Sequence, residues 1–250
     1  MINLLRVLYR MAYRTLLPVR FWLTDYWGKR DETLPPARLR FRVTESVDPV
    51  AYLATGISGA QGIQTIFADA GHPLEECDSI LDFGCGCGRI LAHLRTGAHE
   101  IWGVDVDRES VEWCNAHLAG VRCKLANADP PLAFDSGYFQ SIYALSVFTH
   151  LSIDRQRAWR DELFRLLRPG GLLLFTVHAE HVRRSRVGAE GFSFETSDKL
   201  KGIVPDWYHT AFQSHESVLA VFGERFEKVI CVPRGMGDQD VYLASGSRGW

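Results

Sequence analysis

The most informative part of this chain is the stretch Ile80-Leu81-Asp82-Phe83-Gly84-Cys85-Gly86-Cys87-Gly88-Arg89. It starts as a short apolar strand, passes through an acidic residue and continues with three glycines at alternate positions. Glycines at this spacing allow a tight turn and let the backbone approach a ligand closely. Residues 91–94 return to helical spacing, so the stretch predicts a strand, a glycine turn and a helix. In open α/β sheets such a turn lies at the carboxyl end of a strand, where ligands bind.

The spacing of the glycines separates two kinds of ligand. A dinucleotide fingerprint, Gly-x-Gly-x-x-Gly/Ala, would need glycine or alanine at position 89, which is an arginine. The pattern Asp82-x-Gly84-x-Gly86-x-Gly88 resembles instead the first motif of class I S-adenosylmethionine-dependent methyltransferases. This resemblance implies that Asp82 helps to hold the amino group of S-adenosylmethionine. It also implies that the methionine part of the cofactor packs against Gly84, Cys85, Gly86 and Gly88.

A second apolar strand covers residues 101–107 and ends in two aspartates. A carboxylate at this place, about 20 residues beyond the glycine turn, can accept hydrogen bonds from both hydroxyls of a ribose. Asp105 matches the ribose-binding position of the resembled family, with Val106 beside it, and Asp107 suits the N-cap of the following helix. The alternative is that both aspartates only cap that helix.

The resemblance continues after the third and fourth strands. The third strand, residues 121–125, is followed by Asn127 and Ala128, which match the segment that contacts adenine. An asparagine side chain can accept a hydrogen bond from the adenine amino group. The fourth strand, residues 139–145, is followed by Ser146, which we also assign to the cofactor site.

The order of these strands predicts the architecture. A fifth strand follows the helix stop at residues 167–171 and ends at position 178, and segments 226–232 and 239–244 read as two more strands. The resemblance implies an α/β fold: a Rossmann-like seven-stranded, mostly parallel sheet with an antiparallel C-terminal hairpin and helices on both faces. Five motifs carry a second resemblance: Pro131-Leu132-x-Phe134, Ser146-Val147-Phe148-Thr149-His150-Leu151, Trp159, Leu167-Arg168-Pro169-Gly170-Gly171 and Gly237-x-Gln239-Asp240. With them, roughly residues 35–245 resemble bacterial methyltransferases associated with polysaccharide or glycosyl-transfer systems.

Composition fits one compact domain. The chain has 250 residues, of which 46% are hydrophobic and 23% charged, and a net charge of −2. This charge argues against a large surface for nucleic acid. The six cysteines lack the spacing of a disulfide scaffold, and the Cys85–Cys87 pair has no second pair at zinc-finger spacing. We therefore expect no metal and a cytoplasmic protein.

Residues 1–32 form an N-terminal extension to the domain at 33–250. Arg6, Arg10 and Arg14 share one helical face, apolar residues cover most of the other, and Pro18 limits the expected helix to about the first 17 residues. Three interpretations stay open for this basic amphipathic helix. It could pack on the domain or mediate self-association, lie on an anionic membrane surface as a peripheral contact, or act as a targeting peptide.

Residues 33–71 form a second segment before the glycine turn. Arg38, Arg40 and Arg42 alternate along what we expect to be an extended stretch, as a solvated edge or as part of the acceptor site. Asp48-Pro49 should open a helix towards position 54, and a separate helix should cover residues 63–70. In the resembled family such a segment covers the cofactor pocket or helps to shape the acceptor site.

The segment 178–213 is longer than a minimal fold needs, and we expect it to form a lid on the acceptor side. Its arginines and aromatic residues suit a planar, glycosidic or anionic acceptor, and they suit a packed flap equally. They are Arg183, Arg184, Arg186, Phe192, Phe194, Trp207, Tyr208 and Phe212.

The sequence thus predicts methyl transfer from S-adenosylmethionine to a small-molecule or glycan acceptor, with oxygen as the expected target atom. A hydroxyl acceptor must lose a proton, and a histidine is the natural base near neutral pH. The candidates, in order, are His150, His178 and His209, each of which could also be a structural histidine. A nucleotide-dependent oxidoreductase and a non-catalytic cofactor-binding module are the alternatives.

Overall fold

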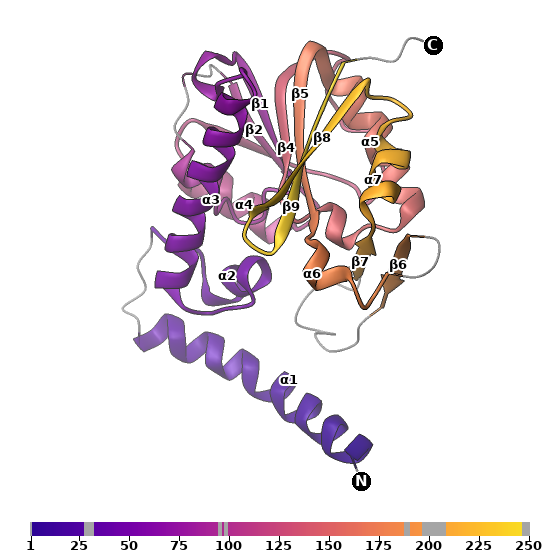
Figure 1. Cartoon of the computed structure of the whole chain (residues 1–250). Helices are drawn as coiled ribbons and strands as arrows, with labels where there is room; N and C mark the ends of the chain where they lie inside the picture. The colour runs from indigo at the N-terminus through magenta and orange to yellow at the C-terminus, as the bar shows by residue number, and fades with distance from the viewer. Residues whose placement is uncertain are drawn as a thin grey trace.

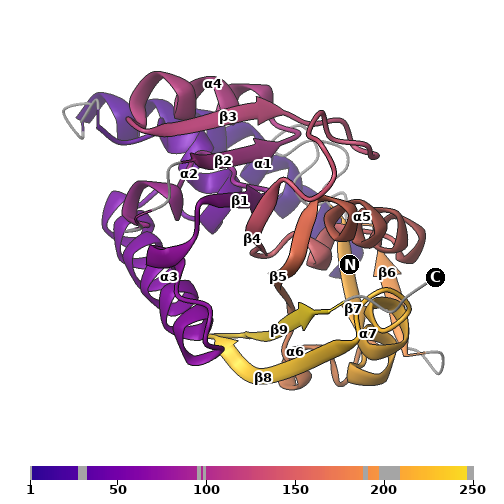
Figure 2. The same cartoon turned by 90° about the horizontal axis from the view of Figure 1, so that it is seen from above.

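The central sheet has seven strands, as predicted. They are β1 Ser79–Phe83, β2 Glu100–Asp105, β3 Val121–Leu125, β4 Phe139–Ala144, β5 Leu167–His178, β8 Lys228–Met236 and β9 Gln239–Ser245. The computed structural model describes residues 2–27, 33–94, 97, 100–187, 191–196 and 209–246. The strand order is β3-β2-β1-β4-β5-β9-β8 (Figures 1 and 2). Strands β1 to β5 pair in parallel, and β9 runs antiparallel to both β5 and β8, which confirms the predicted C-terminal hairpin.

Helices cover both faces of this sheet (Figure 2). Helices α3 (Pro49–Asp69) and α4 (Arg108–His117) lie on one face, where Ile63 and Phe67 pack with Ile80. Helices α5 (Ile153–Leu166) and α7 (His215–Phe222) lie on the other, where Trp159 and Phe222 belong to the larger apolar core. The result is the predicted three-layer α/β fold.

Short elements connect these layers. They are the 3-10 turns η1 Leu74–Glu76, η2 Leu91–His93 and η3 Phe148–His150, helix α6 Glu180–Arg183, and the two-stranded sheet of β6 Phe192–Glu195 and β7 Thr210–Gln213. Elements α6, β6 and β7 belong to the predicted lid. Its residues Trp207 and Tyr208 lie outside the described part of the chain.

Two predicted element boundaries need correction. The helix expected after the glycine turn is only the 3-10 turn η2 among the described residues. Gly84, Gly86 and Gly88 all have positive φ (+83°, +52° and +77°), which a right-handed helix does not adopt, so the turn extends through residue 88. The helix stop at residues 167–171 is confirmed, since α5 ends at Leu166, but β5 begins earlier than predicted, because Leu167 already pairs with Phe139 before a register shift.

Helix α3 is continuous, whereas the sequence predicts two separate helices. Asp48 caps it through Val50 N, 2.9 Å away, as expected. The glycines inside it serve close packing. A Cβ atom on Gly56 would lie 2.5 Å from the carbonyl oxygen of Arg89, and one on Gly59 would lie 2.4 Å from Cδ1 of Ile90. Tertiary contact therefore outweighs the weak helix propensity of these glycines.

The stretch with alternating arginines is a helix, α2 (Ala37–Thr44), and not an extended strand. Arg40 is buried and donates hydrogen bonds to the carbonyl oxygens of Pro35 (2.6 Å) and Val47 (3.0 Å). Arg38 and Arg42 are four residues apart and share the opposite side. The predicted strand spacing is therefore wrong for these three arginines, because the helix buries Arg40 and places Arg38, which is exposed, on the opposite side.

Helix α1 (Ile2–Trp27) continues through Pro18, where the sequence predicts its end. Contacts on both sides of the proline hold the helix in place. Leu17 is buried against Phe41 of α2 with Tyr13 and Phe21 packed beside it, and Asp25 accepts a hydrogen bond from Ala37 N at 2.9 Å. The C-terminal half of α1 is thereby attached to α2 (Figure 1).

Candidate functional site

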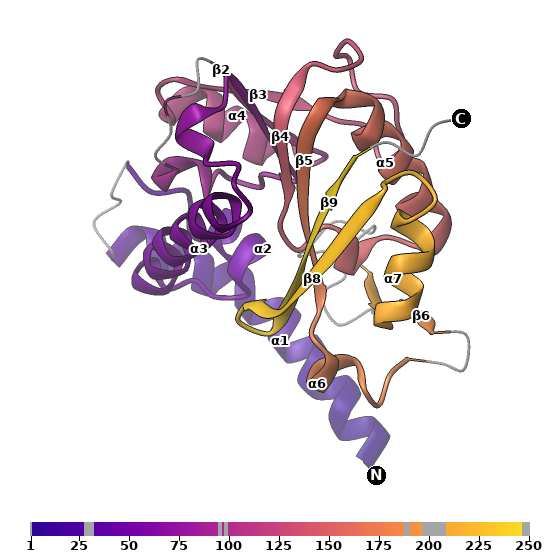
Figure 3. The ribbon, with the colours of Figure 1, turned by 45° about the horizontal axis from the view of Figure 1, so that its top comes forward.

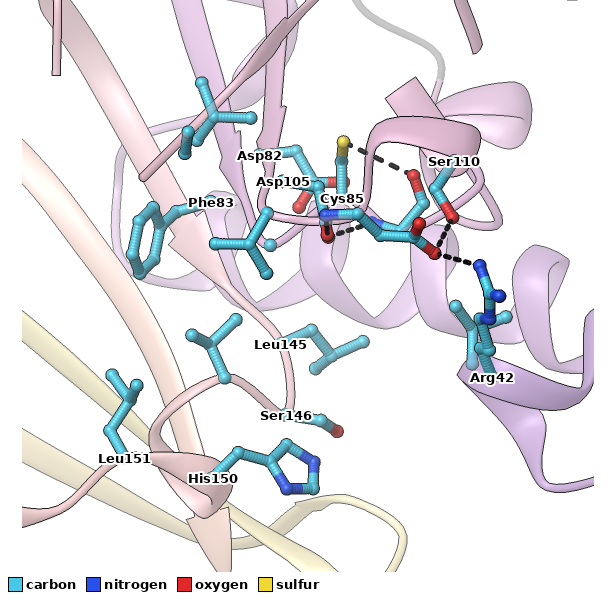
Figure 4. Close-up of a pocket in the computed structure, with 18 of the residues that line it drawn as sticks. Arg42, Asp82, Phe83, Cys85, Asp105, Ser110, Leu145, Ser146, His150 and Leu151 are labelled. Atoms are coloured by element: carbon cyan, nitrogen blue, oxygen red, sulfur yellow. Dashed lines mark hydrogen bonds and ion pairs between the residues drawn. The ribbon is translucent and has the colours of Figure 1, made fainter. Parts of the chain in front are cut away.

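A cavity opens at the carboxyl ends of β1, β2 and β4, next to α2 (Figure 4). Most of the predicted site residues line it. They are Asp82, Gly84, Cys85, Gly86, Asp105, Val106, Asn127, Ala128, Ser146 and His150. Figure 4 shows Asp82 and Asp105 on one side of this space and Ser146 and His150 on the other.

The glycine loop is shaped by its close neighbours. Gly84 has a φ of +83°, and a Cβ atom there would lie 2.2 Å from Cγ2 of Val147. Gly86 has a φ of +52°, and its Cβ would lie 2.6 Å from Cγ1 of Val43. Any side chain at these two positions would clash as well as strain the backbone.

Gly88 does not line the cavity. A Cβ atom there would lie 2.4 Å from Cδ1 of Leu118 and 3.0 Å from Sγ of Cys114, so the position packs against the end of α4. The structure therefore gives Gly88 a packing role, and its predicted contact with the cofactor has no geometric support.

Asp105 joins the end of β2 to the glycine loop. One carboxylate oxygen accepts a hydrogen bond from Gly86 N at 2.7 Å, and the other accepts one from Asp107 N at 2.8 Å. Burial raises the pKa of Asp105 to about 6, although these two bonds oppose the shift. The side chain thus supports the loop while it faces the cavity.

Asp82 is the second carboxylate of the site. It is buried at the end of β1 and accepts a hydrogen bond from the hydroxyl of Tyr143 at 2.9 Å. Burial raises its pKa well above the ordinary value, while the bond from Tyr143 and the charge of Arg89 act in the opposite direction. A cation bound in the cavity would favour the ionised form, because opposite charges nearby stabilise a carboxylate.

Asp107 stands at the N-cap position of α4, as predicted, but its side chain caps no backbone group. It accepts hydrogen bonds from Ser110 Oγ (2.9 Å) and from Arg42 of α2 (2.7 Å). Arg42 also reaches Glu109, at 2.9 Å. This bridge holds α2 over the cavity, and the sequence could not reveal it because α2 and α4 are 64 residues apart or more.

Aromatic and apolar residues form the remaining wall. Trp159 of α5 lines the cavity, packs against Phe83 with ring centroids 4.6 Å apart, and donates from Nε1 to the carbonyl oxygen of Ala128 at 3.1 Å. This bond orients the segment at Asn127. The site therefore combines two carboxylates and a bare backbone loop with an apolar, partly aromatic wall.

The three candidate histidines lie near one another, but only His150 lines the cavity. His150 Nδ1 is 2.6 Å from the carbonyl oxygen of His209, so Nδ1 carries the proton and Nε2 the lone pair. Burial lowers the pKa of His150 below its ordinary value. Burial and the neighbouring His150 lower the pKa of His178 to about 4, and the His178 ring stacks on Phe212.

Three thiols meet behind the loop, which the sequence spacing did not indicate. The Sγ atoms of Cys85, Cys114 and Cys123 all lie within 4.8 Å of one another, in an apolar cluster with Leu91 and Val111. They come from the glycine loop, α4 and β3. The predicted pair partner, Cys87, is instead close to the Tyr52 hydroxyl.

Comparison with known proteins finds a family match over part of the chain. Residues 80–171 match the family described as a methyltransferase domain. The matched region runs from β1 into β5 and contains the glycine loop, Asp105, Asn127 and His150.

Relatives with described activities match part of the chain. A tRNA N(3)-methylcytidine methyltransferase of Schizosaccharomyces pombe is 25% identical over 170 residues, which cover 60% of this chain and 51% of that protein. A phosphoethanolamine N-methyltransferase of Plasmodium falciparum is 27% identical over 139 residues, which cover 54% of this chain and 50% of that protein. The chain thus spans about half the length of these curated relatives.

Among solved structures, an S-adenosylmethionine-dependent methyltransferase from Clostridium acetobutylicum aligns with a TM-score of 0.58 at 12% identity. The alignment covers 78% of this chain and 92% of that one. This likeness shows that the sheet and its helices have the fold of class I methyltransferases.

Proposed function

We propose that this chain, which carries a class I S-adenosylmethionine-dependent methyltransferase domain, transfers a methyl group from S-adenosylmethionine to an oxygen atom of a small-molecule or carbohydrate acceptor. The observation that supports this most is the cavity itself. The glycine loop and both carboxylates line it, and all of them lie within the residues that match the family.

The cofactor would extend across the cavity from Asp82 to Asn127. Asp82 would pair with the ammonium of the methionine part, and its ionised form would then gain a charge partner. Asp105 would accept hydrogen bonds from the ribose hydroxyls with the lone pairs that Gly86 N and Asp107 N do not use. The adenine would lie by Asn127 and Ala128.

Methyl transfer needs alignment more than strong acid–base chemistry. The sulfonium carbon is already activated, so the acceptor oxygen must approach opposite the departing sulfur, in a site closed to water. Positioning of this kind contributes roughly 7–11 kcal/mol to catalysis. In the proposed reaction the oxygen–carbon bond forms as the carbon–sulfur bond breaks, and the sulfur leaves with both electrons as neutral S-adenosylhomocysteine.

His150 is our choice for the general base. It lines the cavity opposite Asp82 and Asp105 (Figure 4), and burial keeps its imidazole neutral at pH 7. Its Nε2 would take the proton that the acceptor hydroxyl loses. His178 and His209 stay second choices, because they lie beside His150 and do not line the cavity.

The acceptor class is less constrained than the reaction. The two relatives described above differ widely in acceptor, since one is a tRNA N(3)-methylcytidine methyltransferase and the other is a phosphoethanolamine N-methyltransferase. The net charge of −2 disfavours RNA, and the carbohydrate preference rests on sequence motifs alone.

The test is release of S-adenosylhomocysteine from purified protein and S-adenosylmethionine, with a panel of sugar, phenol, amine and tRNA acceptors. We expect turnover with a hydroxyl acceptor. Cofactor binding without turnover on any acceptor would favour a non-catalytic binding module, and turnover on tRNA alone would overturn the small-molecule assignment.

A further inference from the structure

Helix α1 leaves one long face of the molecule apolar and uncovered. Six large side chains between positions 16 and 27 are 41% to 76% exposed. They are Leu16, Val19, Trp22, Leu23, Tyr26 and Trp27. Surface hydrophobic residues scattered singly need no explanation, but a contiguous apolar patch of this size marks an interaction site.

The spacing places these residues together. Leu16, Val19, Leu23 and Tyr26 follow one another at intervals of three and four, so they share one helical face. The Trp22 and Tyr26 rings stack with their centroids 5.1 Å apart. The domain binds the other side of the helix, where Leu17 is buried against α2, so the exposed face takes no part in holding α1 to the domain.

The charge of the helix indicates the kind of partner. Residues 2–27 contain the arginines Arg6, Arg10, Arg14 and Arg20, and Asp25 is their single acidic residue. The Asp25 carboxylate is used by α2, since it accepts from Ala37 N and lies 3.9 Å from Arg40. The helix is therefore strongly basic as well as apolar.

We propose that α1 binds an anionic lipid bilayer, lying in the plane of its surface with the face from Leu16 to Trp27 in the headgroup region. Basic residues with an apolar face rich in tryptophan and tyrosine are typical of such helices. Two copies of so basic a helix would repel one another, whereas an anionic surface attracts it. Among the described residues, no helix is long and apolar enough to cross a membrane.

The orientation also bears on the acceptor. Helix α2 packs against α1 and lines the cavity through Arg42 and Val43, so the cavity and α1 lie at the same end of the molecule (Figures 1 and 3). If the proposed function holds, on which this step rests, the acceptor would reach the cavity from the membrane side. A hydroxylated amphiphile held in the bilayer would meet that requirement.

The test is flotation of the full chain with vesicles, without cofactor or acceptor, so that it is independent of the proposed function. We expect binding to vesicles containing phosphatidylglycerol, weak binding to pure phosphatidylcholine, and release at high salt. The double variant Leu16→Glu/Val19→Glu should reduce binding at least tenfold with an unchanged melting temperature. The control Val50→Glu, an equally large change at a residue 70% exposed on α3, should bind as the wild type does.

Absence of binding to any vesicle would overturn the proposal, as would equal binding by the wild type and the double variant. Light scattering on the same samples tests the alternative partner, which is a second copy of the chain. A dimer that Leu16→Glu/Val19→Glu abolishes, in a chain that ignores vesicles, would assign the face to a second copy of the chain.

Discussion

At the residue scale, two carboxylates decide what the cavity can bind. Asp105 supports the glycine loop through Gly86 N, and Asp82 is held by the Tyr143 hydroxyl. Burial raises the pKa of both. Each is therefore costly to ionise in the empty cavity, and a ligand that carries hydroxyls and an ammonium group relieves that cost.

Replacing Asp105 by asparagine should lower the affinity for S-adenosylhomocysteine. Hydrogen bonds to a charged group contribute about 1.5–3 kcal/mol, so we expect a loss of roughly 10- to 100-fold, measured by calorimetry. The wild-type affinity should also fall as the pH drops through about 6, because the ionised carboxylate is the better acceptor and is lost below its pKa. Asp82 acts in the same direction. An affinity that stays constant from pH 7.5 to 5 would contradict this role.

His150 makes a separate prediction about turnover. Replacing it by alanine should reduce kcat by about 10²- to 10⁴-fold at unchanged cofactor affinity, because general base catalysis contributes that much. Burial lowers the pKa of His150, so the neutral base persists to lower pH, and the acidic limb of the wild-type kcat profile should lie below pH 6.5. His181→Ala, at an exposed histidine paired with Asp238, is the matched control. Full turnover by His150→Ala would remove it as the base.

At the scale of elements, α2 acts as a cover that is fastened to α4. Ion pairs from Arg42 to Asp107 and Glu109 join the two helices, and little of the Arg42 side chain is exposed. Arg38 also pairs with Glu109 (2.6 Å), but the Arg38 side chain is half exposed to solvent. The two arginines are one helical turn apart, and only Arg42 lines the cavity.

Arg42→Gln should therefore speed the release of S-adenosylhomocysteine, and Arg38→Gln should not. A partly buried ion pair of this kind contributes about 1 kcal/mol, or roughly fivefold in rate, whereas exposed pairs contribute less. Stopped-flow displacement measures both. Equal rates for the two variants would mean that α2 does not retain the cofactor.

Helix α3 gives a stability prediction. Gly56→Ala should destabilise the fold by about 1–3 kcal/mol, because the new methyl group would meet the backbone carbonyl of Arg89. Gly62→Ala is the control, since its methyl would meet only the flexible end of Met236, 2.8 Å away, and alanine favours the helix. Calorimetric melting curves of both variants measure this difference in stability. A Gly56→Ala variant as stable as Gly62→Ala would contradict the packing argument.

The same elements explain which features the sequence could predict. The strands carry short apolar runs, and the glycines at positions 84 and 86 predict a tight turn, so the strands and the turn were predicted correctly. Helix α2 was not, because alternation at positions 38, 40 and 42 fits a strand, and only the burial of Arg40 against two carbonyls selects the helix. The sequence did not predict the ion pair between Arg42 and Asp107 that holds α2 over the cavity, or the cluster of three thiols. The residues of both features come together only in the folded chain.

At the scale of the whole molecule, the sheet order brings the ends of β1, β2 and β4 together beside α2, and α1 lies on the far side of α2 (Figure 1). The parallel strands direct the loop, both carboxylates and His150 to one edge, where open α/β sheets bind their ligands. The antiparallel hairpin completes the sheet, and its Gln239 donates to Ser146 Oγ at 2.6 Å, which fixes the Ser146 side chain at the wall of the cavity.

The most direct test of the proposed cofactor site is calorimetric titration of the full chain with S-adenosylhomocysteine and, separately, with NAD. We predict one S-adenosylhomocysteine site per chain, weakened in Asp105→Asn, and no heat from NAD. Heat from NAD alone, or S-adenosylhomocysteine binding that ignores the Asp105 substitution, would contradict it.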